Sequence, residues 1–187
     1  MEAMTEAVST DSGRVTRGRA HSALRHLWFF GVALLVVALD QASKQAVRSF
    51  MDLHDYYPSN DWPVRLHYVT NTGAAFGVLQ DQAAFLALTS IIGLGAIVLY
   101  YWTQSTGHAL VSVAMGMMLG GAAGNLIDRV RLGKVTDFID FPHYPSFNLA
   151  DSSIVIAVVI LIVTYGLLEP KTERDARGPG PEPSADR

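Results

Sequence analysis

The chain has 187 residues, of which 50% are hydrophobic and 17% are charged, a composition typical of a membrane protein. The formal net charge is -3, and no basic stripe carries interleaved aromatic residues, so nucleic-acid binding is not expected. Because the cysteine count is 0, a disulfide framework, a thiolate metal site and a cysteine nucleophile are all excluded.

The hydrophobic segments predict four membrane spans. A helix that crosses the bilayer core needs about 20 mainly apolar residues. Four segments meet this requirement, at roughly residues 27–47, 83–102, 109–126 and 153–168. An even number of spans places both ends of the chain on the same side of the membrane. We therefore expect an all-α integral membrane protein with four transmembrane helices.

Basic residues flank these spans at both ends of the chain. They are Arg14, Arg17, Arg19 and Arg25 before the first span, and Lys171, Arg174 and Arg177 after the last. By the positive-inside rule, both ends are predicted to be cytoplasmic, although the basic residues at 129, 131 and 134 weaken the bias. Residues 1–26 are polar without periodicity and residues 169–187 are rich in Pro and Gly, so both are predicted to be disordered. The membrane domain is then 27–168.

The first span has a second interpretation, as a secretory signal peptide that follows an Arg-bearing leader. The lack of an A-x-A-like cleavage site and the three further spans disfavour it. The span also contains Asp40 and Lys44, which lie four residues apart on one helical face in the orientation that favours pairing. Ionisable residues inside spans are candidates for function by default. We expect the pair either to neutralise itself or to support a site.

The first segment between spans contains a short predicted strand. Residues 64–69, V-R-L-H-Y-V, alternate in character and are rich in β-forming residues. The strand ends at the turn signal formed by Asn71, Thr72 and Gly73. We expect a small β element on the outer ends of the helices, with the N-T-G-A-A-F loop as a lid over a site.

The third span combines small residues with a polar end. Gly116, Gly120 and Gly124 recur at a spacing of four, which lets helices approach closely in lipid. At its end, Asn125 and Arg129 share one helical face. Asp128 is interpreted mainly as a helix-end acid that pairs with a nearby cation.

Acidic residues also precede and open the fourth span. Asp137 and Asp140 follow the third span, and we expect one of the two to be solvated. Asp151 is expected to cap the N-terminus of the fourth helix, although Ser152 or Ser153 could do the same. Only a short segment joins Asp137 to Asp151, which allows their carboxyl groups to converge. Two carboxylates about 3 Å apart share a proton instead of both ionising.

A proton-sharing pair of carboxylates is what an aspartyl protease requires. One carboxylate acts as general base on a water molecule, and its protonated partner polarises the scissile carbonyl and then protonates the leaving amine. No metal is expected, because the chain has no H-E-x-x-H motif and no pair of histidines four apart. A serine nucleophile with a lysine base is disfavoured, since Ser43 and Lys44 are adjacent and diverge by about 100° on a helix. Pairing of Ser43 with a lysine from elsewhere in the chain stays open at this point.

Five motifs together resemble those of the bacterial lipoprotein signal peptidases, the signal peptidase II family. They are D-Q-A-S-K at 40–44, N-T-G-A-A-F-G at 71–77, G-G-A-A-G-N-L-I-D-R at 120–129, V-T-D-F at 135–138 and F-N-L-A-D-S at 147–152. The match covers residues 27–168 in order and spacing. Thr136 stands where a valine is common in the family.

The resemblance implies an inner-membrane aspartyl endopeptidase that removes the signal peptide of diacylglyceryl-modified prolipoproteins, cutting just before the lipidated cysteine. It implies no cofactor, a site near the outer face, contact with membrane lipids, and inhibition by globomycin-type peptides. By motif position, Asp137 and Asp151 are the expected catalytic pair. The residues expected to bind substrate or support the site are Asp40, Lys44, Asn71, Gly73, Gly121, Asn125, Arg129 and Asn148.

Three other classes of protein are alternatives to this interpretation. A small transporter or channel subunit would use the acids as a proton relay, but they cluster at one interface instead of stepping through the bilayer. An intramembrane protease of the presenilin type would carry a G-x-G-D motif, which is absent. A non-enzymatic scaffold explains the glycines and leaves the two aspartates unexplained.

Overall fold

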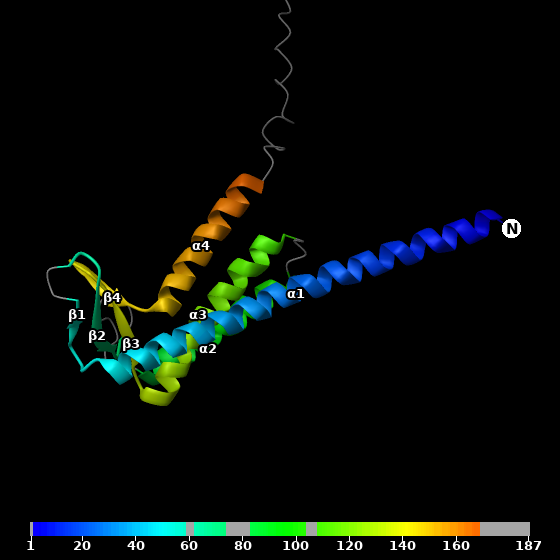
Figure 1. The fold of residues 1–187 in the computed structure, drawn as a ribbon. Helices are drawn as coiled ribbons and strands as arrows, with labels where there is room; N and C mark the ends of the chain where they lie inside the picture. Colours follow the sequence, from blue (N-terminus) through cyan, green and yellow to red (C-terminus); the bar gives the residue numbers. More distant parts are fainter. Residues whose placement is uncertain (1, 59–61, 74–82, 104–107, 169–187) are drawn as a thin grey trace, which may run out of the picture.

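The computed structural model describes residues 2–58, 62–73, 83–103 and 108–168, with side chains described from residue 23 onward. Four helices and four strands make up this part of the chain (Figure 1). The helices are α1 (Glu2–Phe50), α2 (Ala83–Thr103), α3 (Ala109–Leu132) and α4 (Leu149–Leu168). The strands are β1 (Tyr56–Tyr57), β2 (Arg65–Asn71), β3 (Val135–Phe141) and β4 (Tyr144–Phe147).

All four helices are long and apolar enough to cross a membrane, which confirms the predicted membrane fold. The segments that qualify are 23–50, 84–103, 109–132 and 149–166. Three helices are longer than expected at the end near the sheet: α1 continues from residue 47 to Phe50, α3 continues from 126 to Leu132, and α4 begins at Leu149 instead of 153. The added turns are polar, so a count of apolar residues alone could not include them.

The N-terminal segment is helical, which corrects the prediction of no fold for residues 1–26. Helix α1 begins at Glu2 and runs without interruption into the first span. This stretch holds no proline, and helix elongation adds one hydrogen bond for each residue fixed once a helix exists. The apolar span can therefore extend the helix backward through a polar segment. The C-terminal segment 169–187 lies outside the described residues.

Helix α3 is the centre of the bundle, in contact with α1, α2 and α4. Its glycines allow these contacts, as the four-residue spacing predicted. A Cβ atom on Gly116 would lie 2.5 Å from the carbonyl oxygen of Phe29, and one on Gly120 would lie 2.6 Å from that of Ala33, both on α1. Side chains of any size would force α1 away from α3.

The strands form one antiparallel sheet in the order β1-β2-β3-β4. The sheet lies at the end of the bundle where α1 ends and α4 begins (Figure 1). The strand predicted at 64–69 is present as β2, shifted to 65–71. The N-T-G-A-A-F lid expected after it lies outside the described residues from Ala74 onward.

Strands β3 and β4 were not predicted. The segment 135–141 reads V-T-D-F-I-D-F, in which β-branched and aromatic residues are interrupted by two aspartates that have low strand propensity. Gly133, at φ 70°, ends α3 in the left-handed conformation and turns the chain back toward β2. Pairing with β2 then decides the strand, since Asp137 lies opposite Val69 in the ladder.

Candidate active site

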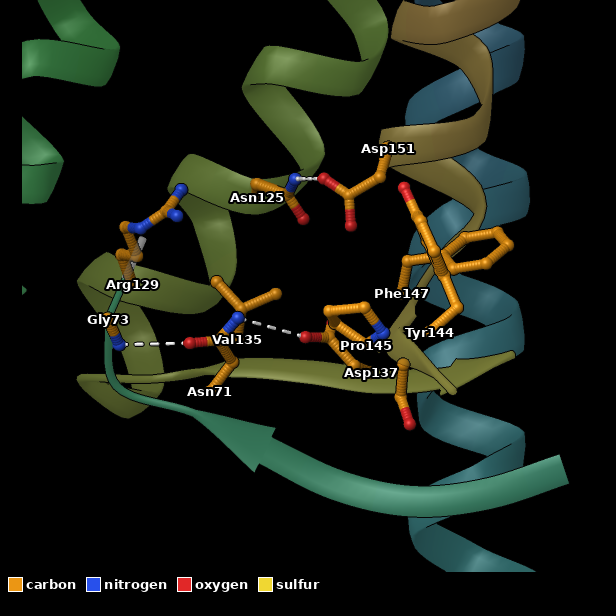
Figure 2. Close-up of a pocket in the computed structure, with 11 residues that line it drawn as sticks. Asn71, Gly73, Asn125, Arg129, Val135, Asp137, Tyr144, Pro145, Phe147 and Asp151 are labelled. Atoms are coloured by element: carbon orange, nitrogen blue, oxygen red, sulfur yellow. Dashed lines mark hydrogen bonds between the residues drawn. The ribbon is translucent and has the colours of Figure 1, made fainter. Parts of the chain in front are cut away.

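The two aspartates predicted to converge come from different elements at the same end of the bundle. Asp137 lies at the centre of β3, and Asp151 lies in the first turn of α4. Both line one cavity of about 230 Å³ (Figure 2). The sheet and the helical bundle therefore meet at this cavity, as the short connection between the two residues predicted.

Asp137 is buried and is held by two asparagine side chains. Asn148 Nδ2 donates to its Oδ1 at 2.7 Å, and Asn71 Nδ2 donates to its Oδ2 at 3.2 Å. Burial, followed by the negative charge of Asp151, raises the pKa of Asp137 from 3.8 to about 7, although both asparagine hydrogen bonds oppose the shift. A carboxyl group with this pKa can hold or release a proton near neutral pH.

Asp151 is the third residue of α4, and the helix cap is Asn148. Asn148 Oδ1 accepts from the Asp151 backbone N–H at 3.0 Å, and Asp151 Oδ2 accepts from the Asn148 backbone N–H at 3.3 Å. This reciprocal pair is a capping box. The predictions of Asp151, Ser152 or Ser153 as the cap were therefore wrong. Asn148 has the short polar side chain that the position favours.

Asn125 connects Asp151 to the interior of the bundle. Its Nδ2 donates to Asp151 Oδ1 at 2.7 Å (Figure 2). Its Oδ1 accepts from Lys44 Nζ at 2.9 Å and from Asn148 Nδ2 at 3.1 Å. These bonds use both lone pairs of the amide oxygen, which fixes the amide so that its N–H group points at Asp151.

Behind the asparagines lies a buried group of charges. Lys44 Nζ is 3.0 Å from Asp40 Oδ2 and 3.3 Å from Asp128 Oδ2, and all three side chains are at most 1% exposed. The predicted pairing of Asp40 with Lys44 is confirmed, as is the interpretation of Asp128 as an acid tied to a cation. Asp40 and Asp128 also accept the backbone N–H groups of Ala150 and Thr136, each at 3.0 Å. The charges thus hold the start of α4 and of β3 against α1.

The remaining predicted residues divide between the cavity and its support. Asn71, Gly73, Asn125 and Arg129 line the cavity with the two aspartates. Arg129 Nη1 donates to Ser90 Oγ at 3.5 Å, and Gly73 donates its backbone N–H to Asn71 Oδ1 at 2.9 Å.

The other four predicted residues, Asp40, Lys44, Gly121 and Asn148, lie outside the cavity lining. Gly121 lets α3 approach α4, since a Cβ atom there would lie 2.5 Å from both Ala150 O and Ser153 Oγ. Asp40, Lys44 and Asn148 act through the hydrogen bonds already described. Thr136, the departure from the family pattern, accepts a hydrogen bond from Arg48 Nη1 at 2.9 Å.

One wall of the cavity was missed by sequence reasoning. It consists of the β4 residues Tyr144, Pro145, Ser146 and Phe147. The alternation signal of a four-residue strand is weak, and Pro145 lowers it further. A second, mainly apolar pocket of about 420 Å³ shares Tyr144, Phe147 and Asp151 with the first. It continues along α4 past Val155 and Ile156.

The expectation that Asp137 or Asp140 would be solvated was wrong. Asp140 is only 6% exposed, because Arg65 and Ser146 enclose it. The alternative serine and lysine pairing is disfavoured again, since Ser43 Oγ donates to the backbone oxygen of Asp40 at 2.9 Å. Its hydroxyl is therefore directed into its own helix.

Comparison with known proteins agrees with this geometry. The family model described as signal peptidase (SPase) II matches residues 32–167. The chain belongs to the signal peptidase II family. This membership confirms the resemblance read from the five motifs and displaces the transporter, presenilin-type and scaffold alternatives.

Curated relatives and solved structures of similar sequence extend the match across the membrane domain. The lipoprotein signal peptidase of Shouchella clausii is 40% identical over 76% of this chain and 95% of its own. That of Caldanaerobacter subterraneus is 41% identical over 70% and 90%. A solved bacterial membrane enzyme superposes with a TM-score of 0.69 at 32% identity, over 76% of this chain and 91% of its own. The match to signal peptidase II therefore covers the part of the chain that contains the site.

Proposed function

We propose that Asp137 and Asp151 are the catalytic pair of this signal peptidase II, an aspartyl endopeptidase that removes signal peptides from diacylglyceryl-modified prolipoproteins. Cleavage falls just before the lipidated cysteine. The observation that carries the proposal is the shared cavity: two carboxylates 14 residues apart in the chain line one space with an arginine and two asparagines.

The raised pKa of Asp137 supports its assignment as the protonated member of the pair. With a pKa of about 7, Asp137 holds a proton through much of the neutral range. Asp151 then carries the charge, stabilised by the N–H groups of Asn125 and of the Asn148 backbone. One acid and one base at the same cavity are the two groups that acid–base hydrolysis of an amide needs.

The reaction follows from these two protonation states. Asp151 removes a proton from a water molecule, whose oxygen attacks the scissile carbonyl carbon while protonated Asp137 donates a hydrogen bond to the carbonyl oxygen. The resulting tetrahedral species breaks at its C–N bond, and a proton passes to the leaving amine. Arg129 and Asn71 line the same cavity, where their N–H groups can hold the substrate backbone in place.

The membrane determines where the bond must be presented. The cavity adjoins the start of the span 149–166, at the end of the bundle that carries the sheet. A cysteine with acyl chains in the outer leaflet brings its peptide bond to that level. The apolar pocket along Val155 and Ile156 offers a surface on which acyl carbons stay out of water.

The chain spans its membrane several times, and we place it in the bacterial inner membrane with both termini cytoplasmic and the site near the outer face. The basic residues before the first span and after the last support this orientation. Partners in this proposal are prolipoproteins with a diacylglyceryl-cysteine, the surrounding lipids, and globomycin-type peptides that occupy the cavity as uncleaved substrate mimics.

Cleavage by purified protein tests the proposal. Wild type, Asp137→Asn and Asp151→Asn are incubated with a diacylglyceryl-modified prolipoprotein, and product masses are measured. Asp52→Asn is the matched control, because Asp52 is an exposed acid in the segment after α1. We expect wild type and the control to cut before the modified cysteine, and both dyad variants to be folded and inactive. Cleavage by either dyad variant at more than about one hundredth of the wild-type rate would contradict the catalytic assignment.

A further inference from the structure

A further buried carboxylate, Asp140, lies on β3 three residues beyond Asp137 and takes no part in the mechanism above. It is 6% exposed and joins three strands. Arg65 of β2 donates its Nε–H to Asp140 Oδ2. Ser146 of β4 donates its hydroxyl to Asp140 Oδ1 at 2.7 Å. His67 Nδ1, also from β2, lies 3.6 Å from Oδ1.

The two basic residues beside Asp140, which are Arg65 and His67, both contact one aromatic ring. The Arg65 guanidinium carbon lies 4.9 Å from the ring centre of Tyr56 on β1. The His67 ring stacks on the same ring at 3.9 Å. Burial would raise the pKa of Asp140, but the hydrogen bonds from Ser146 and Arg65 outweigh it and leave the pKa below its usual value. The carboxylate therefore stays ionised and accepts hydrogen bonds across the neutral range.

Strand β4 depends on this carboxylate because its backbone pairing is poor. The ladder between β3 and β4 pairs Ile139 with Phe147 and Phe141 with Tyr144, with a register shift between them. Pro145 lies within the irregular part and has no N–H group to donate. Ser146 follows it, so the side-chain bond to Asp140 fastens β4 where the ladder does not.

Strand β4 is also the wall of the catalytic cavity. Tyr144, Pro145, Ser146 and Phe147 line the cavity opposite residues of β2 and α3. We propose that Asp140 and Ser146 are positioning residues of the protease: their hydrogen bond fixes the wall Tyr144–Phe147 against β3 and so limits which substrate side chain fits beside the scissile bond. The specificity part of this inference rests on the proposed function.

Kinetics with two substrates test the inference. Two diacylglyceryl-modified prolipoproteins are compared that carry alanine or leucine immediately before the modified cysteine. Ser146→Ala removes the hydroxyl, Ser146→Thr retains it, and Ser49→Ala makes the same change at an exposed position on α1. For Ser146→Ala we expect KM for the alanine substrate to rise about fivefold with kcat nearly unchanged, the loss that one hydrogen bond represents.

The discrimination between the alanine and leucine substrates is a sharper test than KM alone. We expect the ratio of kcat/KM between the alanine and leucine substrates to fall in Ser146→Ala and to stay at the wild-type value in Ser146→Thr and Ser49→Ala. A merely structural role would lower the active fraction, which reduces kcat equally for both substrates and leaves KM and the ratio unchanged. Unchanged KM and ratio in Ser146→Ala would overturn the inference.

Hydrogen exchange supplies a readout that does not depend on catalysis. In detergent-solubilised full-length protein, we expect Ser146→Ala to accelerate amide exchange in β4 and to leave β2 at the wild-type rate. Equal exchange in β4 of the variant and the wild type would overturn the positioning role, whatever the activity. Failure of wild type to cleave at all would instead count against the proposed function, and exchange would still decide the contact.

Discussion

Two groups of acidic side chains lie within the same end of this molecule, and they are built in opposite ways. Asp40 and Asp128 share the buried cation Lys44 and accept backbone N–H groups. Asp137 and Asp151 receive only amide hydrogen bonds and line a cavity. Lys44 and Arg48, whose Nη1 lies 3.8 Å from Asp128 Oδ1, neutralise the charge of the first group, whereas the second is left with one acid that retains a proton near pH 7. The comparison separates acids that hold the fold from the two acids that we propose perform the chemistry.

The largest expected effect is on the rate of cleavage. Asp137→Asn removes the proton donor and should lower kcat by about 10²–10⁴-fold, the usual contribution of a positioned acid or base. Asp128→Asn makes the same chemical change in the neutralised group. Each folded molecule of this variant should retain more activity than a folded molecule of Asp137→Asn. Single-turnover cleavage with active-site titration measures both. Equal losses per folded molecule would erase the distinction between the two groups.

The same variant, Asp137→Asn, should lose activity but gain thermal stability. The folded-state pKa of Asp137 is raised from 3.8 to about 7, so its ionisation costs folding free energy as the pH rises through this window. Asp137→Asn should therefore unfold at a higher temperature than wild type above pH 7. In contrast, Lys44→Met leaves the buried Asp40 without a cation and Asp128 with only Arg48, whose Nη1 is 3.8 Å from Asp128 Oδ1, and should cost about 3–5 kcal/mol.

Thermal unfolding in one detergent, followed by circular dichroism at pH 8, measures both changes. The double variant Lys44→Met with Asp40→Asn is the control, because it also removes the carboxylate that Lys44→Met leaves without a cation. It should recover part of the loss. If Lys44→Met unfolds like wild type, the neutralising role of Lys44 is wrong.

A change at the contact between α3 and α1 should also disturb the buried carboxylate of Asp40. A Cβ atom on Gly124 would lie 2.5 Å from Asp40 Oδ2, so Gly124→Ala should displace that carboxylate and cost about 1–3 kcal/mol. Gly95→Ala on α2 is the control, since nothing lies within 4 Å of its added Cβ. The control should be neutral or slightly stabilising, because alanine favours helix. Equal unfolding midpoints for the two variants would contradict the close contact.

The smallest expected effect concerns pH. If protonated Asp137 is the acid, kcat should fall as the pH rises through about 7, to about one tenth of its plateau one pH unit above. The decrease follows the loss of a proton from a group that must carry one. Initial rates between pH 5 and 9 on the same substrate measure it. A rate that rises through pH 7 would assign the proton to the other aspartate.

Parts of the site were predictable because their signals are local. Asp40 and Lys44 lie four residues apart on a helix, and any helix brings such residues together. Gly116 and Gly120 likewise mark a packing face by spacing alone. The capping residue was missed, since Asn148 and Asp151 compete for that position and only the observed start of α4 decides between them.

The sequence by itself determined the four membrane helices and the pairing of Asp40 with Lys44, since length, hydropathy and helical spacing are properties of short segments. Its motifs singled out Asp137 and Asp151 as the expected catalytic pair, and tertiary structure decided which groups surround these two aspartates. Strand pairing of β3 with β2, nowhere visible in local pattern, brings Asp137 beside Asn71, and the cap of α4 brings Asp151 beside Asn125. The burial of Asp140, too, depends on Arg65, which lies 75 residues away in the chain. Partners this distant are set by folding, because the free energy of a buried charge depends on which groups surround it.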